Sequence, residues 1–268
     1  MDHRSCMVYG LAIFLGIHTV AARAQTADEL RAIYFRGDIS RMEEIASAGD
    51  VRAEAWMGLM LLNRGRRLEA KEWWRRAAEK GNRWAMTNLA RVHLADKEDE
   101  EAARWFGRGA DAGNLDAMRE YAFLVLQGRG VTKDQPAAAR WYSKLTAQGD
   151  KFSYLPLAEL YASGTGVAYD LVEAYALASI AEAILDDSDL FGERLGRLKG
   201  TLEMELAPTQ MKAASLRARA MRPDLKRLRF AKEESRPSAP IAPLVLVALG
   251  LGTIVAIVIY RSARRAAR

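Results

Sequence analysis

Residues 49–189 contain one pattern written four times, and this repetition constrains the fold more than any other feature of the chain. Each copy begins at a glycine, and successive glycines are separated by 32, 32 and 36 residues. Small residues stand four and nine places after each glycine, and in three copies an aromatic pair precedes the next one. The glycines are Gly49, Gly81, Gly113 and Gly149, and the pairs are Trp73-Trp74, Trp105-Phe106 and Trp141-Tyr142. A fixed period of about 34 residues indicates an array of stacked structural repeats.

Each copy predicts two antiparallel α-helices. The small residues share a helical face with the bulky residue eight places after the glycine, so two helix backbones can approach closely there. The aromatic pair places large apolar side chains on the second helix, and the glycine ends a helix in the left-handed conformation that a Cβ would penalise. Because one hairpin cannot bury its apolar face alone, the copies must stack. We therefore predict an all-α fold of the α-solenoid class.

The third and fourth copies resemble the Sel-one-like repeats, which are relatives of the tetratricopeptide repeat. The strings are QGRGVTKDQPAAARWYSKLTAQGD (residues 127–150) and LAELYASGTGVAYDLVEAYALA (residues 157–178). Both show that family's GxGV loop followed by an acidic residue, and the first also shows its alanine-aromatic block. The loop residues are Gly128, Gly130 and Val131, then Gly164, Gly166 and Val167. The first two copies are four residues shorter and look more like plain tetratricopeptide hairpins. The resemblance covers about half of the chain and implies an α/α solenoid of helix hairpins.

Residues 1–24 are typical of a secretory signal peptide. A weakly basic start precedes an apolar run from about Met7 to Val20, and Ala22-Arg23-Ala24 supplies the small-x-small cleavage pattern. The mature chain would then begin at Gln25. The alternative is an uncleaved anchor helix, for which the apolar run is short.

Cysteine usage fits export without disulfides. Cys6 is the only cysteine and lies inside the predicted signal, so the mature chain would have none. The sequence also lacks an Asn-x-Ser/Thr glycosylation sequon. These two absences favour a bacterial envelope over the eukaryotic secretory pathway.

The four copies are expected to lie within a solenoid that spans residues 25–222. Residues 26–48 resemble a degenerate leading repeat, with a capping-box pattern at Thr26 and Glu29. The repeats are placed at about 49–80, 81–112, 113–148 and 149–188. Two capping helices are predicted at 189–206 and 208–222, the second of which starts at Pro208.

The C-terminal segments predict a membrane anchor. Residues 223–240 are charged and bear prolines, which favours an extended linker. Residues 241–260 carry no charge and are just long enough to span a bilayer as a transmembrane helix, and residues 261–268 form a basic tail. A small-xxx-small stripe in the apolar segment would allow a weak homodimer. Its residues are Ala248, Gly252 and Ala256.

Charge is divided unevenly along the chain. Residues 25–211 carry 25 basic and 30 acidic side chains, whereas residues 212–236 carry nine basic and three acidic ones. The isoelectric point near 9.5 therefore reflects the flanks of the predicted membrane helix and does not indicate nucleic-acid binding.

Six Lys and Arg residues precede the predicted membrane helix closely and four follow it, which slightly favours a cytoplasmic body. A cleaved signal peptide would nevertheless direct the repeat body across the membrane before the last helix is synthesised. We therefore predict a single-pass protein of a bacterial inner membrane, with its repeat body in the periplasm and its tail in the cytoplasm.

The sequence gives little support for catalysis. His93 is the one histidine of the predicted mature chain and stands where the repeat buries an aromatic ring, so we expect a satisfied core histidine and not a base. There is no cysteine nucleophile, no His/Cys metal cluster and no G-x-S-x-G elbow. The Gly-x-Gly pairs and the acidic runs at 98–101 and 186–189 are expected to be turns, not phosphate or calcium loops. We predict no enzyme activity, no cofactor and no metal.

The most informative surface lies on the first helix of each copy. If the copies align with tetratricopeptide repeats, the groove-facing positions lie 3, 6, 10 and 14 places after each glycine, and aromatic residues beside arginines there indicate a binding hot spot. The alternative is that the aromatic residues pack between neighbouring hairpins. The predicted partner-binding residues are Trp84, Thr87, Arg91, Asp116, Arg119, Phe123, Gln127, Phe152 and Glu159.

These observations predict a non-catalytic scaffold or adaptor that is tethered to a membrane and docks a protein partner in a concave groove. The resemblance implies the same, since such repeats serve in signalling, secretion and envelope assembly. The resemblance also allows an immunity protein that neutralises a secreted envelope-targeting toxin such as a phospholipase. A third possibility is a peptidoglycan- or β-lactam-directed enzyme, which no serine-lysine signature supports here.

Overall fold

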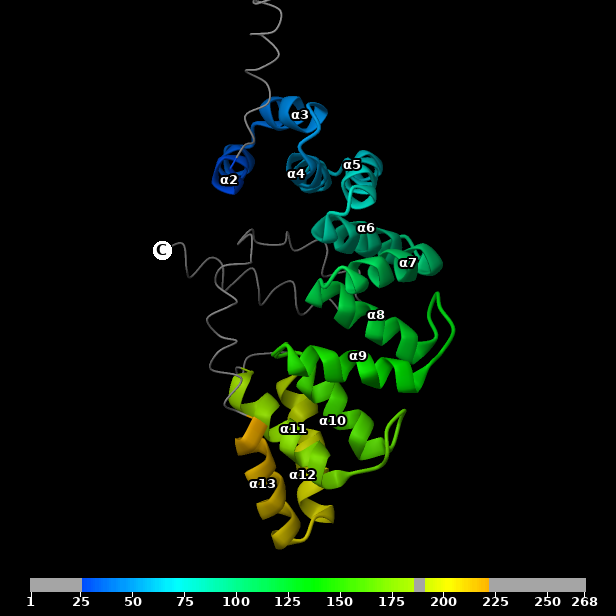
Figure 1. The fold of residues 1–268 in the computed structure, drawn as a ribbon, viewed down its shortest axis with the longest axis vertical. Helices are drawn as coiled ribbons and strands as arrows, with labels where there is room; N and C mark the ends of the chain where they lie inside the picture. Colours follow the sequence, from blue (N-terminus) through cyan, green and yellow to red (C-terminus); the bar gives the residue numbers. More distant parts are fainter. Residues whose placement is uncertain (1–25, 186–190, 222–268) are drawn as a thin grey trace, which may run out of the picture. The chain divides into compact units, whose positions relative to one another are not determined.

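The computed structural model describes residues 26–185 and 191–221, and throughout these ranges the chain is helical, with no strand (Figure 1). The helices are α2 (Ala27–Arg36), α3 (Ile39–Ser47), α4 (Val51–Asn63), α5 (Arg67–Glu79), α6 (Arg83–Ala95), α7 (Asp99–Asp111), α8 (Leu115–Gln127), α9 (Gln135–Ala147), α10 (Tyr154–Ser163), α11 (Leu171–Ile184), α12 (Gly192–Glu205) and α13 (Pro208–Met221). They pair as the hairpins of an α-solenoid, which confirms the all-α class. None of these helices is long and apolar enough to cross a membrane. The predicted signal, linker, membrane helix and basic tail lie outside the described residues.

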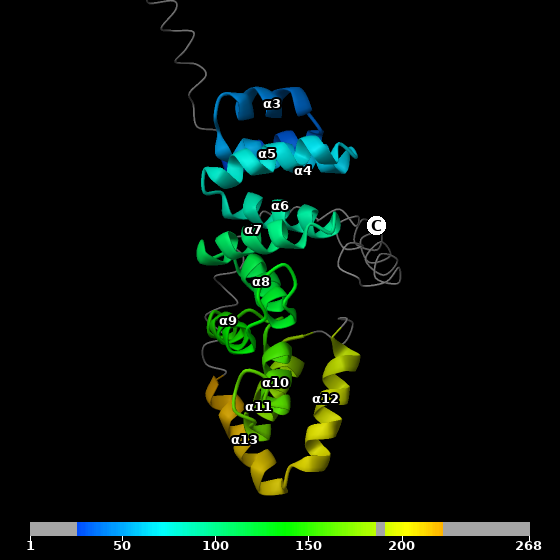
Figure 2. The same ribbon diagram turned by 90° about the vertical axis from the view of Figure 1, so that its right-hand side faces the viewer.

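The helices fall into two compact units, one that ends at Leu89 and one that begins at Ala90. In the first unit α4 packs against both α3 and α5. In the second unit α8 packs between α7 and α9, α10 pairs with α11, and α11 also packs against α12 and α13 (Figures 1 and 2). The last two helices, α12 and α13, therefore pack on α11 of the preceding hairpin.

Small residues allow the helices of each hairpin to approach closely. The clearest case is Gly58 on α4, where a Cβ would lie 2.6 Å from the indole of Trp74 on α5. The Trp74 indole N–H donates to the carbonyl of Ala55 at 2.9 Å, which fixes the ring against α4. The residues four and nine places after each repeat glycine are all buried, and they are Ala53, Ala85, Ala117, Ser153, Gly58, Ala90, Ala122 and Ala158.

The leading hairpin forms as the sequence predicts. The hydroxyl of Thr26 accepts the backbone N–H of Glu29, and the Glu29 carboxylate accepts the backbone N–H of Thr26, which completes the capping box. Gly37 ends α2 in the left-handed conformation, with φ of 69°. On α3 the side chains of Met42 and Ile45 are buried.

The four repeat glycines also adopt the expected left-handed conformation. Gly49, Gly81, Gly113 and Gly149 have φ values of 97°, 89°, 80° and 74°. Each follows a helix C-terminus and begins the turn into the next hairpin. The two Gly-x-Gly pairs are turns as well, since all four of their glycines have φ between 67° and 73°.

The second glycine of each Gly-x-Gly pair allows one loop to touch the preceding hairpin. A Cβ on Gly130 would lie 2.0 Å from the carbonyl oxygen of Asp99, and a Cβ on Gly166 would lie 2.3 Å from that of Gln135. Asp99 and Gln135 begin α7 and α9. Each long loop therefore rests directly on the backbone at the start of the previous second helix, which no larger residue would permit.

We predict that Gly130→Ala destabilises the protein more than Gly113→Ala does. Both positions carry the cost of a left-handed alanine, about 1–2 kcal/mol. At Gly113 nothing lies within 4 Å of the added Cβ, whereas at Gly130 the Cβ overlaps the Asp99 backbone. We expect Gly130→Ala to cost about 1–3 kcal/mol more in the free energy of unfolding, measured by urea denaturation. Equal losses would show that the loop can move away from α7.

Candidate functional site

The residue after each repeat glycine is Asp or Asn, and in three copies its side chain caps the first helix. Asp50 accepts the backbone N–H groups of Arg52 and Ala53 at the start of α4. Asn82 does the same at α6, and Asn114 accepts the N–H of Ala117 at α8. These caps satisfy backbone donors that would otherwise lack a partner.

In the fourth copy the corresponding residue, Asp150, does not cap a helix. The first helix of this copy, α10, begins only at Tyr154. Pro156 explains the delay, because a proline has no N–H and clashes with the carbonyl four residues before it in a helix interior. Starting at Tyr154 places Pro156 in the first helical turn, where the missing donor costs nothing. The Asp150 carboxylate is thereby available for other contacts.

The Asp150 carboxylate pairs with Arg119 on α8. The guanidinium donates two hydrogen bonds to the Asp150 carboxylate, from Nη2 at 2.8 Å and from Nε at 3.1 Å. The Ser153 hydroxyl donates a third at 2.6 Å, and Arg119 also donates to Asp116 at 3.0 Å. Because the Asp150 side chain is only 2% exposed, this carboxylate is a buried anchor and not a surface ion pair.

The electrostatic surroundings hold Arg119 in its charged form. Burial opposes the charge, but the adjacent carboxylates of Asp150 and Asp116 outweigh this and raise the pKa of Arg119 above its ordinary value. The guanidinium also lies 5.1 Å from the ring centroid of Phe152, so the side chain is restrained by both hydrogen bonds and a cation–π contact. We call Arg119, Asp116, Asp150, Phe152 and Ser153 the Arg119 network.

Phe152 joins this network to the capping helices. Its ring centroid lies 5.9 Å from that of Phe191, at the start of α12, and the Lys151 ammonium lies 4.7 Å from it. Nearby, the Arg194 guanidinium of α12 donates two hydrogen bonds to the Glu159 carboxylate of α10. Ion pairs and aromatic contacts thus connect α8, α10 and α12 on one side of the second unit.

Glu120 differs from the other acidic residues of this region because no described residue donates a hydrogen bond to its carboxylate. Burial raises the pKa of the Glu120 carboxyl, while the charges of Arg91 and Arg119 lower it and Asp116 raises it further. Burial and the Glu120 charge together also raise the pKa of the buried Tyr142 phenol. Glu120 is therefore a partly buried acid without a direct partner.

One face of α8 presents these groups together with an exposed aromatic ring. Phe123 follows Arg119 by one helical turn and is 47% exposed, and Gln127 follows by another turn and is also exposed. We call this face the α8 stripe. It comprises Asp116, Arg119, Glu120, Phe123 and Gln127.

Comparison with known families finds the Sel1 repeat four times in this chain, at residues 51–82, 85–114, 115–150 and 156–182. The chain is a Sel1-repeat protein. The fourth match begins at Pro156, the residue that delays α10, and leaves out residues 151–155, which include Phe152 and Ser153.

One solved structure of a similar protein shows the same fold. A Sel1 repeat protein from Oxalobacter formigenes shares 22% identity over 71% of this chain and 86% of its own length, with a TM-score of 0.58. A protective antigen of uropathogenic Escherichia coli that displays an SLR fold shares 23% identity over 78% of this chain, with a TM-score of 0.47. This chain spans only 56% of that antigen. The comparison with curated proteins gives no match. Sel1 repeat proteins are generally non-catalytic and mediate protein–protein interactions.

The structure places four of the predicted partner-binding residues close together, and two more lie exposed on the α8 stripe. Asp116, Arg119 and Phe152 meet in the Arg119 network, and Glu159 joins the adjacent ion pair. Phe123 and Gln127 are the exposed residues of the α8 stripe. The positive charge of Arg91 lowers the pKa of Glu120 in the same stripe. The residues of this region that the sequence reasoning missed are Asp150 and Ser153 of the Arg119 network, Glu120 of the α8 stripe, and Arg194 of the adjacent ion pair.

Two of the predicted partner-binding residues on α6, Trp84 and Thr87, pack against neighbouring groups of the protein itself. Trp84 packs against Trp56 with ring centroids 5.6 Å apart, as expected of an aromatic residue between hairpins. Thr87 is buried, and its hydroxyl donates to the carbonyl of Arg83 at 2.9 Å. Neither side chain resembles the exposed Phe123.

His93 is buried, as predicted, but it is only half satisfied. Its Nδ1 pairs with the carboxylate of Glu98, while Nε2 has no hydrogen-bond partner among the described residues. Of the two acidic runs, residues 98–101 do not form a turn as predicted: Asp99, Glu100 and Glu101 form the first turn of α7. Asp99 pairs with Arg129 at 2.7 Å. The run at 186–189 lies outside the described residues. No cluster of metal-ligating side chains occurs within the described ranges.

We predict that Glu120→Gln stabilises the protein at pH 7 and that this gain disappears in acid. A raised pKa means that the folded state binds the Glu120 proton more tightly than the unfolded chain does. Ionised Glu120 therefore costs stability as the pH rises from the unfolded pKa, about 4.3, through the higher folded pKa. Glutamine cannot ionise and avoids this cost.

The measurement is the free energy of unfolding of wild type and variant in urea at pH 7 and at pH 4. Glu100→Gln, at an exposed position on α7, controls for the loss of one negative charge. A Glu120→Gln variant that is less stable than wild type at pH 7 would contradict the assignment of Glu120 as an unpaired acid.

Proposed function

We propose that this Sel1-repeat protein is a non-catalytic scaffold that docks a protein partner on the α8 stripe. The observation that carries the proposal is the exposed Phe123 beside the fixed guanidinium of Arg119. Aromatic and arginine side chains dominate the binding energy of protein interfaces. Because Arg119 is already held by Asp150 and Asp116, a partner would not have to immobilise it, which lowers the entropy cost of binding.

Glu120 is a second reason to place the partner on the α8 stripe, and it favours a partner that carries a hydrogen-bond donor. A partly buried carboxylate without a hydrogen bond lowers the stability of the free protein. A basic or N–H group of a partner that reached Glu120 would supply the missing contact, and the gain would appear only in the complex. The partner segment on this stripe would therefore combine an apolar contact for Phe123 with a hydrogen-bond donor for Glu120.

The arrangement of charges favours docking over catalysis. Four charged side chains of this region neutralise one another in two ion pairs, Arg119–Asp150 and Arg194–Glu159. Each of these four groups is held by its ion-pair partner, which does not favour a role as a catalytic acid or base. Hydrolysis of a chromogenic β-lactam by the purified chain would contradict this proposal and favour the enzyme alternative.

We predict that a photo-crosslinking amino acid at position 123 captures a discrete partner in the native host, whereas the same amino acid at position 216 does not. Leu216 on α13 is 57% exposed and lies off the stripe, so it matches Phe123 in exposure. Adding Glu120→Ala should weaken the crosslink at 123 by about 5- to 30-fold, as for a hot-spot contact. An identical product from both positions, or none from 123, would contradict docking on the α8 stripe.

The identity of the captured partner would also distinguish an adaptor from an immunity protein. An envelope signalling, secretion or assembly component would indicate an adaptor. A secreted toxin such as a phospholipase would indicate an immunity protein, and its activity should then fall on addition of the purified chain.

A location in the bacterial inner membrane, with the repeat body in the periplasm, is also proposed. Its support is the sequence of residues 1–24 and 241–260, which lie outside the described residues. We predict that green fluorescent protein fused after Arg268 fluoresces and that alkaline phosphatase at the same position is inactive. The opposite result would place the tail in the periplasm and overturn the orientation.

A further inference from the structure

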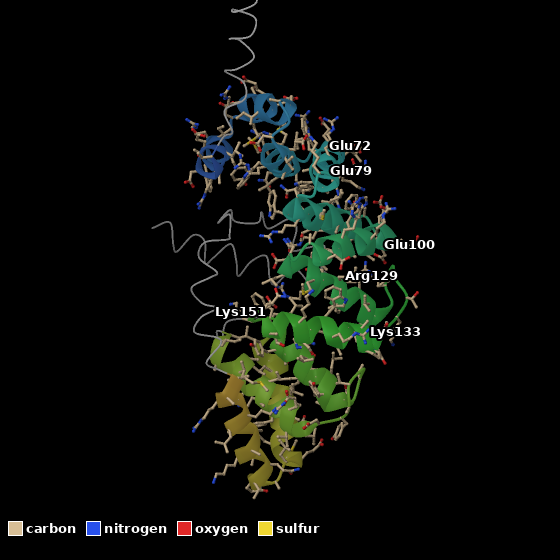
Figure 3. All side chains as sticks on the ribbon, viewed as in Figure 1. Glu72, Glu79, Glu100, Arg129, Lys133 and Lys151 are labelled. Atoms are coloured by element: carbon tan, nitrogen blue, oxygen red, sulfur yellow. The ribbon has the colours of Figure 1, made fainter. Side chains whose placement is uncertain are left out.

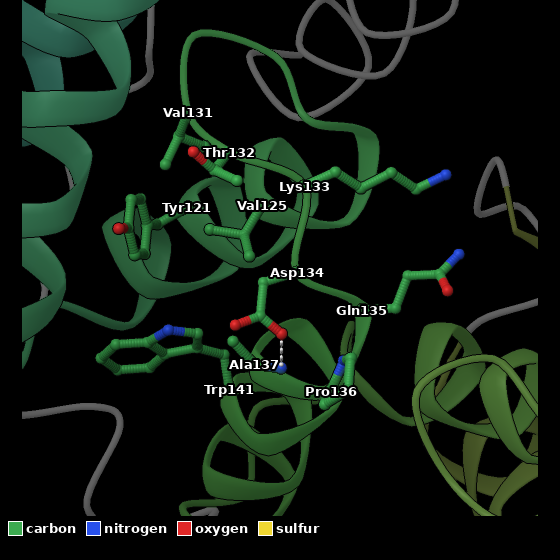
Figure 4. Close-up of a pocket in the computed structure, with 10 residues that line it drawn as sticks. All are labelled: Tyr121, Val125, Val131, Thr132, Lys133, Asp134, Gln135, Pro136, Ala137 and Trp141. Carbon is green, nitrogen blue, oxygen red and sulfur yellow. Dashed lines mark hydrogen bonds between the residues drawn. The ribbon is translucent and has the colours of Figure 1, made fainter.

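The third copy contains a cavity of about 690 Å³ between α8, α9 and the loop that joins them (Figure 4). This volume lies within the range of ligand pockets in proteins, roughly 300–1,000 Å³. Tyr121 and Trp141 form an aromatic corner on one side of it, with ring centroids 5.9 Å apart and an interplanar angle of 81°. The loop residues from Val131 to Asp134, with Gln135 at the start of α9, form the opposite side.

The cavity results from a combination that the neighbouring copies lack. The second copy has a loop four residues shorter, and its equivalent of Trp141, which is Trp105, is only 4% exposed. The fourth copy has the long loop but carries Leu157 and Leu177 at the positions of Tyr121 and Trp141. The aromatic corner and the long loop therefore occur together in the third copy.

A carboxylate is turned toward the aromatic corner. One oxygen of Asp134 accepts the backbone N–H of Ala137 at 2.8 Å and caps α9, while the other points toward Tyr121 and Trp141 (Figure 4). Lys133 and Gln135 extend away from the corner in the same view. Of the two charged residues that line the cavity, Lys133 and Asp134, only Asp134 turns its charge toward the aromatic corner.

Aromatic faces beside a carboxylate attract ammonium and guanidinium groups. The indole of Trp141 already attracts one cation, because the Lys144 ammonium lies 5.0 Å from its ring centroid. Lys144 does not line the cavity, so the cavity side of the indole stays accessible. Asp134 would add charge attraction and a hydrogen-bond acceptor for the same group.

We propose that this cavity receives a lysine or arginine side chain presented by a partner protein. None of the residues that line the cavity belongs to the α8 stripe, although Tyr121 and Val125 also lie on α8. Lys133, which lines the cavity, and Lys151, whose ammonium lies over the Phe152 ring, lie at opposite ends of α9 (Figure 3). The proposal does not depend on the proposed function, because the two sites use different residues. A basic side chain with its flanking backbone matches both the negative charge and the size of the cavity.

The test is binding of the peptide acetyl-GGRGG-amide to the purified full chain, followed through the indole N–H signal of Trp141 in nuclear magnetic resonance spectra. Asp134→Asn removes the charge but keeps the cap, since Asn114 caps α8 in the same way. We expect Asp134→Asn and, separately, Tyr121→Leu to weaken binding at least about threefold. Leucine is the residue that the fourth copy carries at the Tyr121 position.

The fourth copy supplies the matched control. Asp170 caps α11 through the N–H of Glu173, just as Asp134 caps α9, but Leu157 and Leu177 stand at the positions of Tyr121 and Trp141. Asp170→Asn should leave binding unchanged, and acetyl-GGQGG-amide should not bind. Equal binding to the Asp134→Asn variant, or an equal loss in Asp170→Asn, would overturn the proposal.

One further outcome concerns the chain's own basic residues. If the arginine peptide bound only after Lys226, Arg227 and Arg229 were replaced by glutamine, the chain itself would fill the cavity. That result would also overturn the assignment to a partner protein.

Discussion

Close approach of helix backbones is the constraint on which the rest of this structure depends. The Trp74 ring lies where a Cβ on Gly58 would stand, and the Gly130 and Gly166 loops rest on the backbone of the preceding hairpin. Such contacts bury much surface per residue and leave no space for an extra methyl group. They therefore require small residues at fixed intervals, which is why the period of the sequence is so clear in the alanines and glycines.

The candidate surface arises where one copy departs from this regular plan. Pro156 moves the start of α10, so that Asp150 is released from the capping role that its counterparts Asp50 and Asn114 perform. The same departure places Ser153 where the other copies have alanine, and its hydroxyl completes the hydrogen bonds of Asp150. A local change in helix start thus converts a structural carboxylate into the anchor of Arg119, and a rigid α8 stripe follows.

Much of the fold could be predicted from local features, but less of the candidate site could. Caps such as Thr26 and turns such as Gly113 depend on neighbouring residues, so their signals are visible in the chain. Arg119 and Phe123 were found through the repeat register. Asp150 was missed because its partner is 31 residues away, although an Asp or Asn after every repeat glycine, with serine replacing alanine at 153, was a signal that could have indicated it.

The sequence by itself determined the all-α class, the helix hairpins and their turns, because these follow from periodicity and from residues within one or two turns of each other. The Sel1-repeat family followed from the resemblance of its loop motifs to those of known repeats. Only the tertiary structure decided which polar groups pair. It shows that Thr87 is buried, that Glu120 lacks a direct partner, and that Asp134 faces an aromatic corner. Those outcomes depend on distances between helices, and no pattern along one helix contains them.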